Sequence, residues 1–195
     1  DGALLIADEV LCGFGRTGKP FGFMHWDVVP DLITVAKGLA SGYGPIGAVL
    51  VHERVAKHFD ERVLACGLTY YAHPLACAAA VETLNVYRDE KLFERAAELG
   101  PVLRRELDAV AAALPVRSFV RGLGLLAVLE VEAPAAQWAG FAKGLFERRL
   151  SLHVDGGRGT AIISPPLCIS EDELVRGVRG VGEAARSAFV AGGTP

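Results

Sequence analysis

Short continuous apolar runs mark the first part of the chain. The runs ALLIAD, LITVA and AVLVH, at residues 3–8, 32–36 and 48–52, predict three strands, the first two of them buried. The segment between the first two runs is rich in glycine and aromatic residues and holds two prolines, which predicts a long loop over residues 11–31. A short helix is expected at residues 53–59. Strands with apolar residues on both faces are typical of a parallel sheet, so this part is expected to be α/β.

Helical periodicity dominates the rest of the chain. Helices are expected at residues 73–90, 92–113, 135–149 and 171–189, with Ser170 capping the last one and Gly100-Pro101 breaking or kinking the second. SFVRGLGLLAVLEV predicts a strand pair or one long bent strand, and LSLHV and TAIIS predict two short strands around the turn DGGRG. This order of helices and strands predicts helices packed on a small antiparallel sheet. We therefore expect two domains, residues 1–91 and residues 92–195.

The composition excludes several classes of protein. Apolar residues make up 51% of the 195 residues and charged residues 22%, which is typical of a soluble globular chain. A net charge of −3 gives no general affinity for nucleic acid or an anionic membrane, and no apolar run approaches the roughly 18 residues of a membrane-spanning helix. The four cysteines are scattered, which indicates reduced thiols and no metal site. A cytoplasmic location is the expectation that follows.

The segment GFGRTGKP matches two nucleotide-binding patterns at once. Its glycines fit GxGxxG, and GxxxxGK also matches, but each pattern counts only in its structural context. The following KPFGFMHWD has no helical period, Asp8 and Glu9 would repel a diphosphate, and Pro20 stands where a P-loop needs Ser or Thr. We therefore interpret the glycines as allowing tight turns in an irregular loop, with Arg16 and Lys19 as structural or interface charges.

Asp8 and Lys37 are the residues whose side chains most clearly suggest a chemical role. Asp8 ends the first predicted strand and Lys37 follows the second, so both are expected at the same edge of a parallel sheet, where α/β proteins place their sites. One interpretation is a buried ion pair, which would lose much of its Coulomb gain to desolvation. The other is a pyridoxal phosphate site, in which a lysine forms a Schiff base and an acid pairs with the pyridine nitrogen. Spacing alone leaves both open.

The order of motifs resembles the class III pyridoxal-phosphate aminotransferases, or omega-aminotransferases. The resembling segments are LLIADEVLCGFGRTG, PDLITVAKGLASGYGPIG, GLTYYAHPLACAAAVETL, RGLGLLAVLE and ISPPLCIS, and they cover nearly the whole chain. The resemblance implies the type I fold of pyridoxal phosphate enzymes, with part of the large parallel-sheet domain followed by the small C-terminal α+β domain. The sequence starts with a strand, as if within a domain, and the family's phosphate-gripping turn and ring-stacking aromatic residue have no counterpart in it.

The resemblance also implies roles for four residues. Asp8 would bind the pyridine nitrogen, Val10 would pack on the ring, Lys37 would hold the cofactor and shuttle the proton, and Thr69 would bind the cofactor phosphate from the other subunit of a homodimer. The residues alone favour another interpretation, in which Thr69 is a turn residue before Pro74. Arg158 and Arg121 are the candidates for holding a substrate carboxylate, because no arginine flanks SPPL directly.

The implied activity is ping-pong transfer of an amino group from an amine or amino acid to a keto acid. A chain of this length is expected to be an incomplete enzyme that binds the cofactor poorly by itself. Two alternatives stay open: another pyridoxal phosphate enzyme of the same fold, such as a mutase, racemase or decarboxylase, or a non-catalytic fragment that pairs with a partner half.

Overall fold

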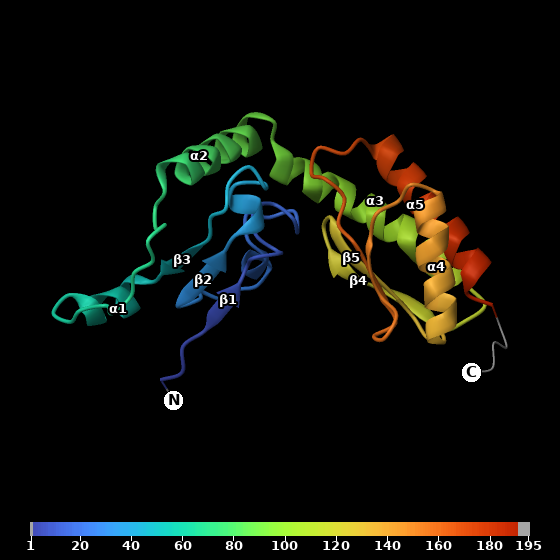
Figure 1. The fold of residues 1–195 in the computed structure, drawn as a ribbon, viewed down its shortest axis with the longest axis horizontal. Coiled ribbons are helices and arrows are strands. Elements are labelled where there is room, and N and C mark those ends of the chain that lie inside the picture. Colours follow the sequence, from blue (N-terminus) through green and yellow to red (C-terminus); the bar gives the residue numbers. More distant parts are fainter. Residues whose placement is uncertain (1, 191–195) are drawn as a thin grey trace. The chain divides into compact units, whose positions relative to one another are not determined.

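The chain folds as two compact units, Asp1–Glu94 and Arg95–Pro195, in a computed structural model that describes residues 2–190 (Figure 1). The domain boundary expected after residue 91 stays a prediction, because a division into compact units does not test which domain each part forms. None of the helices within residues 2–190 is both long and apolar enough to cross a lipid bilayer.

A three-stranded sheet organises the first unit. Its strands are β1 (Ile6–Asp8), β2 (Leu32–Val35) and β3 (Ala48–Val51), in that spatial order. β1 and β2 are parallel, whereas β3 runs antiparallel to β2, so the expectation of a parallel sheet is wrong for β3. The connection over residues 36–47 contains no α-helix, and a parallel crossover is usually made by one. The chain therefore turns back beside β2 instead of crossing over.

Burial of the first strand is a second correction. β1 was expected to be buried, yet Ile6 is 59% exposed, and all four residues of β3 are exposed as well. In β2, Val35 is buried and the other three residues are half-buried. β1 and β3 each have one neighbouring strand in a three-stranded sheet, and an apolar side chain is buried only where neighbouring elements cover it.

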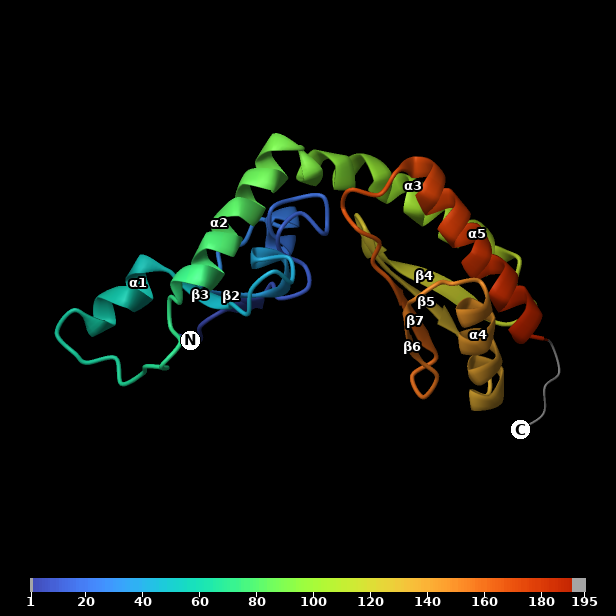
Figure 2. The ribbon, with the colours of Figure 1, turned by 45° about the horizontal axis from the view of Figure 1, so that its top comes forward.

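Short helical segments and one long helix complete the first unit. They are η1 (Gly22–His25), η2 (Lys37–Leu39), α1 (Glu53–Ala56), η3 (Lys57–Phe59) and α2 (Pro74–Asp89). α2 begins as its sequence predicts, with Pro74 in the first turn and the His73 ring accepting a hydrogen bond from the Leu75 amide. Residues 60–72 form no helix or strand, are exposed throughout and extend away from the sheet (Figures 1 and 2).

An antiparallel sheet with three helices makes up the second unit, as expected from the sequence. The strands lie in the order β4-β5-β7-β6, and β4 and β5 form a hairpin, not one bent strand. The strands are β4 (Ser118–Leu123), β5 (Leu126–Val131), β6 (His153–Asp155) and β7 (Thr160–Ile163), and the helices are α3 (Leu92–Ala112), α4 (Ala135–Glu147) and α5 (Glu171–Ala188). α3 continues through Pro101, so of the expected break or kink the break is absent. Leu99 and Leu103, on either side of Pro101, are buried, and packing of this kind supplies most of the stability of helices in proteins.

The core of the second unit lies between its sheet and its helices. Alternate residues of β5 and β7 are buried, which is the pattern of a sheet covered on one face, and the helices lie on one side of it (Figure 2). Trp138, Phe141 and Phe189 pack together with ring centroids 4.9–5.5 Å apart. Ser170 and Glu173 form the capping box that starts α5, as the sequence predicts for Ser170.

Candidate functional site

The ends of β1 and β2 bring Asp8 and Lys37 to the same edge of the sheet. The two strands are parallel with Asp8 opposite Thr34, and Lys37 follows β2 after one intervening residue. Both Asp8 and Lys37 are exposed. A carboxylate and an amine therefore stand at the carboxyl ends of neighbouring parallel strands, which is where the sequence analysis expected them; the roles assigned to them stay predictions.

Two hydrogen bonds hold the Asp8 carboxylate. Its Oδ1 accepts from the backbone amide of Val10 at 3.1 Å and from the hydroxyl of Thr34 at 3.0 Å. The Glu9 amide in turn donates to the Thr34 carbonyl at 2.9 Å, which continues the β1–β2 pairing past Asp8. Val10 is half-buried beside the carboxylate. Sequence reasoning missed Thr34, because the contact depends on strand register between residues 26 positions apart.

The backbone around Lys37 has an uncommon conformation. Lys37 has a φ of +28°, which L-residues rarely adopt, and Ala36 before it is also outside the usual regions. The Ser41 amide donates to the Lys37 carbonyl at 2.9 Å, and the Tyr87 hydroxyl donates to the Gly38 carbonyl at 2.7 Å. Burial raises the pKa of Tyr87, so its hydroxyl stays a donor at neutral pH. Uncommon backbone geometry held in this way clusters at functional sites.

The glycine-rich loop packs against Gly38, the residue that follows Lys37. A Cβ on Gly38 would lie 2.9 Å from the Cβ of Phe14, and the Phe14 ring stacks on Tyr87 with centroids 6.2 Å apart. Gly15, with φ +88°, leaves room for the Phe93 ring, which would be only 2.1 Å from an added Cβ. The glycines therefore allow close packing next to Lys37, and the positive φ of Gly15 and Gly18 fits the tight turns expected of this loop.

Glu9 occupies the donors that an anion would need. Glu9 is 4% exposed, and its carboxylate accepts from the amides of Gly22 and Phe23, each at 2.8 Å. The Lys19 amine donates to the Met24 carbonyl at 2.8 Å, so this lysine has a structural role. The element that follows the loop is the four-residue η1, and it is not an α-helix. This geometry fits a loop with a structural role and neither of the two nucleotide patterns. The roles of Glu9 and Tyr87 were not evident from the sequence, because their partners are distant along the chain.

Thr69 lies in an exposed segment that is not part of the sheet carrying Asp8. It sits in a turn closed by the Tyr71 amide and the Leu68 carbonyl at 3.1 Å, in the exposed segment 60–72. Within the described residues no hydrogen bond joins Thr69 to Asp8, Val10 or Lys37. Thr69 is exposed, so its side chain is accessible to other molecules. The phosphate-binding role stays a prediction.

The two arginines proposed for a substrate carboxylate each have an acidic neighbour in the second unit. Arg121 pairs with Glu130 across the β4–β5 hairpin. Arg158 lies 3.6 Å from the Asp155 carboxylate in the turn between β6 and β7, and its side chain is 85% exposed. Exposed ion pairs of this kind are weak, so either arginine can exchange its partner for another carboxylate. Their assignment to substrate stays a prediction.

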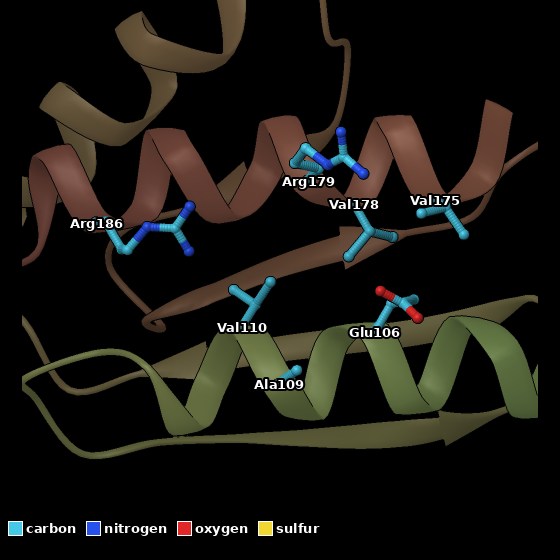
Figure 3. A pocket seen from close by; sticks show the side chains of 7 residues that line it. All are labelled: Glu106, Ala109, Val110, Val175, Val178, Arg179 and Arg186. Carbon is cyan, nitrogen blue, oxygen red and sulfur yellow. The ribbon is translucent and has the colours of Figure 1, made fainter. Parts of the chain in front are cut away.

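Two hollows of the second unit are lined by residues other than the predicted site residues. One, of about 190 Å³, lies between α3 and α5 (Figure 3) and is lined by Glu106, Ala109, Val110, Val175, Val178, Arg179 and Arg186. Another, of about 350 Å³, is lined by Arg148, Leu150, Arg176, Arg179, Gly180 and Glu183. Neither includes Asp8 or Lys37, whose sheet edge is open to solvent. Residues 2–190 also bring together no group of three metal-ligating side chains.

The donor set at the sheet edge fits one end of pyridoxal phosphate. Asp8 offers a carboxylate whose Oδ1 is held and whose Oδ2 accepts no hydrogen bond within the described part of the chain, and Lys37 offers an exposed amine. Those are the two groups that the pyridine nitrogen and the aldehyde require. For the phosphate the predicted residues supply one exposed hydroxyl, that of Thr69.

Comparison with known proteins identifies the family. The profile described as "Aminotransferase class-III" matches residues 1–184. The uncharacterized aminotransferase YhxA of Bacillus subtilis is 38% identical over 94% of this chain, and the omega-aminotransferase of Caulobacter vibrioides is 40% identical over 91% of it. These matches span 44% and 42% of the two relatives, so the chain spans less than half the length of the curated relatives it matches.

Solved structures agree with the sequence matches. A transaminase from the marine bacterium Virgibacillus superposes with a TM-score of 0.90 at 32% identity, over 96% of this chain and 46% of that one. A taurine:2-oxoglutarate aminotransferase from Bifidobacterium kashiwanohense, solved in complex with pyridoxal phosphate (PLP) and glutamate, gives 0.88 at 31% identity, over 94% of this chain and 44% of that one. With Asp8 and Lys37 at one sheet edge and a family match over residues 1–184, the chain belongs to the class III aminotransferases, which use pyridoxal phosphate.

Proposed function

We propose that this chain carries the lysine and carboxylate of a pyridoxal-phosphate site that moves an amino group from an amine or amino acid to a keto acid. The observation that carries the proposal is the parallel pairing of β1 and β2, which sets Asp8 and Lys37 at the same edge of the sheet. Membership of the class III aminotransferases supports the same reaction type.

Each residue has a part that follows from its chemistry. Pyridoxal phosphate, when bound, supplies an aldehyde that takes up the amino group and a ring that accepts electrons. The Lys37 amine would hold the cofactor through its aldehyde and, when free, would take and return a proton as general base and acid. The Asp8 carboxylate would pair with the pyridine nitrogen and keep it protonated. Val10 would pack beside the ring, and Thr69 would donate to the phosphate.

The substrates are proposed only by class. Relatives of this chain include enzymes named diaminobutyrate–2-oxoglutarate transaminase and putrescine–pyruvate aminotransferase. Their names combine different amino donors with keto-acid acceptors. We therefore assign a primary amine or amino acid as donor and a keto acid as acceptor. Two exchangeable ion-paired arginines, Arg121 and Arg158, are the residues proposed to meet the acceptor's carboxylate.

The working form is proposed to be a homodimer in the cytoplasm, with Thr69 serving the partner's site. The exposed position of Thr69 in segment 60–72 supports this proposal. Because the chain spans less than half of its relatives' length, we propose that further protein segments complete the phosphate site and that the 195 residues alone are a weak binder and a poor catalyst.

Trapping the cofactor on lysine tests the proposal even when binding is weak. The chain is incubated with pyridoxal phosphate, reduced with borohydride and digested, and the label on each of the five lysines is quantified by mass spectrometry. We expect Lys37 to be labelled well above Lys19, Lys57, Lys91 and Lys143. Lys37→Arg should lose this excess, whereas Lys57→Arg, which removes an exposed lysine paired with Glu53, should keep it. Even labelling of all five lysines would contradict the proposal.

A further inference from the structure

The Thr34 side chain makes a contact that the amino-transfer chemistry does not itself require. Its hydroxyl donates to Oδ1 of Asp8 at 3.0 Å from the neighbouring strand. Thr34 is the register partner of Asp8 in the parallel β1–β2 pair, and the Glu9 amide fixes the Thr34 carbonyl at 2.9 Å. The position of the hydroxyl relative to the carboxylate is therefore set by the sheet.

The two donors to Oδ1 determine which carboxylate oxygen is available. A carboxylate oxygen accepts about two hydrogen bonds. Oδ1 receives one from Thr34 and one from the Val10 amide, whereas Oδ2 receives none within the described residues. Asp8 is exposed, so side-chain packing does little to fix the rotation of its carboxylate. These two hydrogen bonds are what orients it.

We propose that Thr34 is a positioning residue that holds Oδ1 of Asp8 and so presents Oδ2 to the pyridine N–H of the cofactor; this rests on the proposed function. Groups that bind in a defined geometry gain from being ordered beforehand, because a mobile side chain loses rotamer freedom on binding. The Val10 donor belongs to the backbone and is present whatever the side chain. Thr34 therefore supplies the one side-chain contact that a substitution can remove.

Substitutions at Thr34 separate the hydroxyl from the shape of the side chain. Thr34→Val keeps the β-branched shape that suits a strand and removes the donor, Thr34→Ala removes the donor in a smaller side chain, and Thr34→Ser keeps the donor. Thr160→Val is the matched control: Thr160 is another half-buried strand threonine, in β7, and its side chain has no hydrogen bond within the described residues.

The test measures the concentration of pyridoxal phosphate that gives half-maximal borohydride labelling of Lys37, and the pH dependence of the visible absorption of the bound cofactor. We expect Thr34→Val and Thr34→Ala to raise the half-saturating concentration about three- to tenfold and to shift the pH dependence of the absorption, because the carboxylate that faces the ring nitrogen is changed. Thr34→Ser should return both quantities to within about twofold of the unsubstituted chain, and Thr160→Val should leave both unchanged.

The outcomes separate this inference from the proposed function. If the unsubstituted chain labels Lys37 selectively and both hydroxyl-free variants match it in half-saturation and absorption, Thr34 has no positioning role and the inference is overturned. If the unsubstituted chain shows no preference for Lys37, the proposed function fails and the inference fails with it. Circular dichroism of each variant identifies loss of folding, and the second hydroxyl-free variant decides the question if the first does not fold.

Discussion

At the scale of single residues, the site depends on side chains that hold other side chains and backbone in place. Asp8 is held by Thr34, the Gly38 carbonyl next to Lys37 is held by Tyr87, and the loop behind Lys37 is held by Glu9. Each of these contacts joins residues from separate elements or from the two ends of a loop. A carboxylate and a lysine are common in any sequence, so the roles proposed for Asp8 and Lys37 rest on their placement and on these supporting contacts.

Asp31 gives the first unit a dependence on acid pH. Its carboxylate is 1% exposed and pairs with Arg54, and it also accepts from the Leu5 amide at 2.9 Å. The hydrogen bond from Arg54, followed by that from Leu5, lowers the pKa of Asp31 below its ordinary value. A lowered pKa stabilises the folded form above the ordinary value, near pH 4, and this contribution is lost as the pH falls through the folded value.

We therefore expect amide hydrogen exchange in β1 and β2 to accelerate as the pH is lowered below about 4, after correction for the intrinsic exchange rate. Asp31→Asn should show accelerated exchange already at neutral pH and little further change in acid. Asp60→Asn, at an exposed aspartate of the same unit, is the control and should behave like the unsubstituted chain. An acid response that survives in Asp31→Asn would show that another group is responsible.

At the scale of elements, local signals predicted most of the structure. Pro74 and Ser170 begin α2 and α5 as their chemistry requires, and the apolar runs became β1, β2 and β3. The antiparallel direction of β3 and the exposure of β1 could not be read from the sequence, because direction and burial depend on which elements lie alongside. The positions of Asp8 and Lys37 were predictable from strand ends.

The supporting residues were not predictable for a related reason. The Thr34–Asp8 contact spans 26 positions and the Tyr87–Gly38 contact spans 49. No local pattern encodes a partner at such a distance. Strand register is the one signal that could have found Thr34, since a parallel pair that ends with Asp8 and Lys37 places a β2 residue opposite Asp8.

Two glycines of the first unit, Gly15 in the glycine-rich loop and Gly42 outside it, provide a prediction and its control. Gly15 and Gly42 have nearly the same φ, +88° and +85°, but an added Cβ at Gly15 would meet the Phe93 ring at 2.1 Å, whereas nothing lies within 4 Å at Gly42. Gly42→Ala should destabilise the first unit by about 1 kcal/mol through backbone strain alone. Gly15→Ala should cost about 2–4 kcal/mol, because it adds steric overlap to the same strain.

Denaturant-dependent hydrogen exchange of the first unit measures both values. Equal effects of Gly15→Ala and Gly42→Ala would show that the Phe93 contact is easily relaxed, and would contradict the description of the loop as a closely packed support for Lys37.

Ser170 provides the corresponding prediction for the second unit. Its hydroxyl accepts from the Glu173 amide at 3.2 Å and donates to the Glu173 carboxylate at 2.6 Å. The bond from the hydroxyl to the carboxylate, followed by one from the Ser170 amide at 3.0 Å, lowers the pKa of Glu173. Ser170→Ala removes the cap of α5 and should destabilise the unit by about 1 kcal/mol. Ser151→Ala, at an exposed serine outside the helices and strands, should change stability by less than about 0.5 kcal/mol.

Fluorescence of Trp138 measures this effect during denaturant unfolding. Trp138 is 2% exposed in the core of the second unit, and substituting the exposed Trp26 of the first unit by Phe leaves Trp138 as the one tryptophan signal. An unchanged unfolding midpoint in Ser170→Ala would show that α5 does not depend on its capping box.

At the scale of the whole molecule, the two units differ in how completely they enclose apolar residues. The second unit buries its aromatic cluster and alternate residues of its sheet. The first unit exposes large apolar side chains on β1, on β3 and in the segment 60–72, among them Ile6, Leu50, Val63, Leu68 and Tyr70. Many exposed large apolar side chains are typical of regions that contact other protein. This difference agrees with a chain that spans less than half of its relatives and supports the proposal that further segments complete the site.

The claim that Asp8 and Lys37 form one site is tested most directly by their coupling. Labelling of Lys37 by pyridoxal phosphate and borohydride is compared between the unsubstituted chain, Asp8→Asn and Asp27→Asn, the last removing an exposed aspartate of the same unit. If the two residues grip one cofactor, Asp8→Asn should raise the half-saturating concentration at Lys37 about tenfold or more, the factor that corresponds to 1.4 kcal/mol, whereas Asp27→Asn should leave it unchanged. Equal labelling of Lys37 in all three proteins would show that the carboxylate and the amine act separately, and would contradict the account.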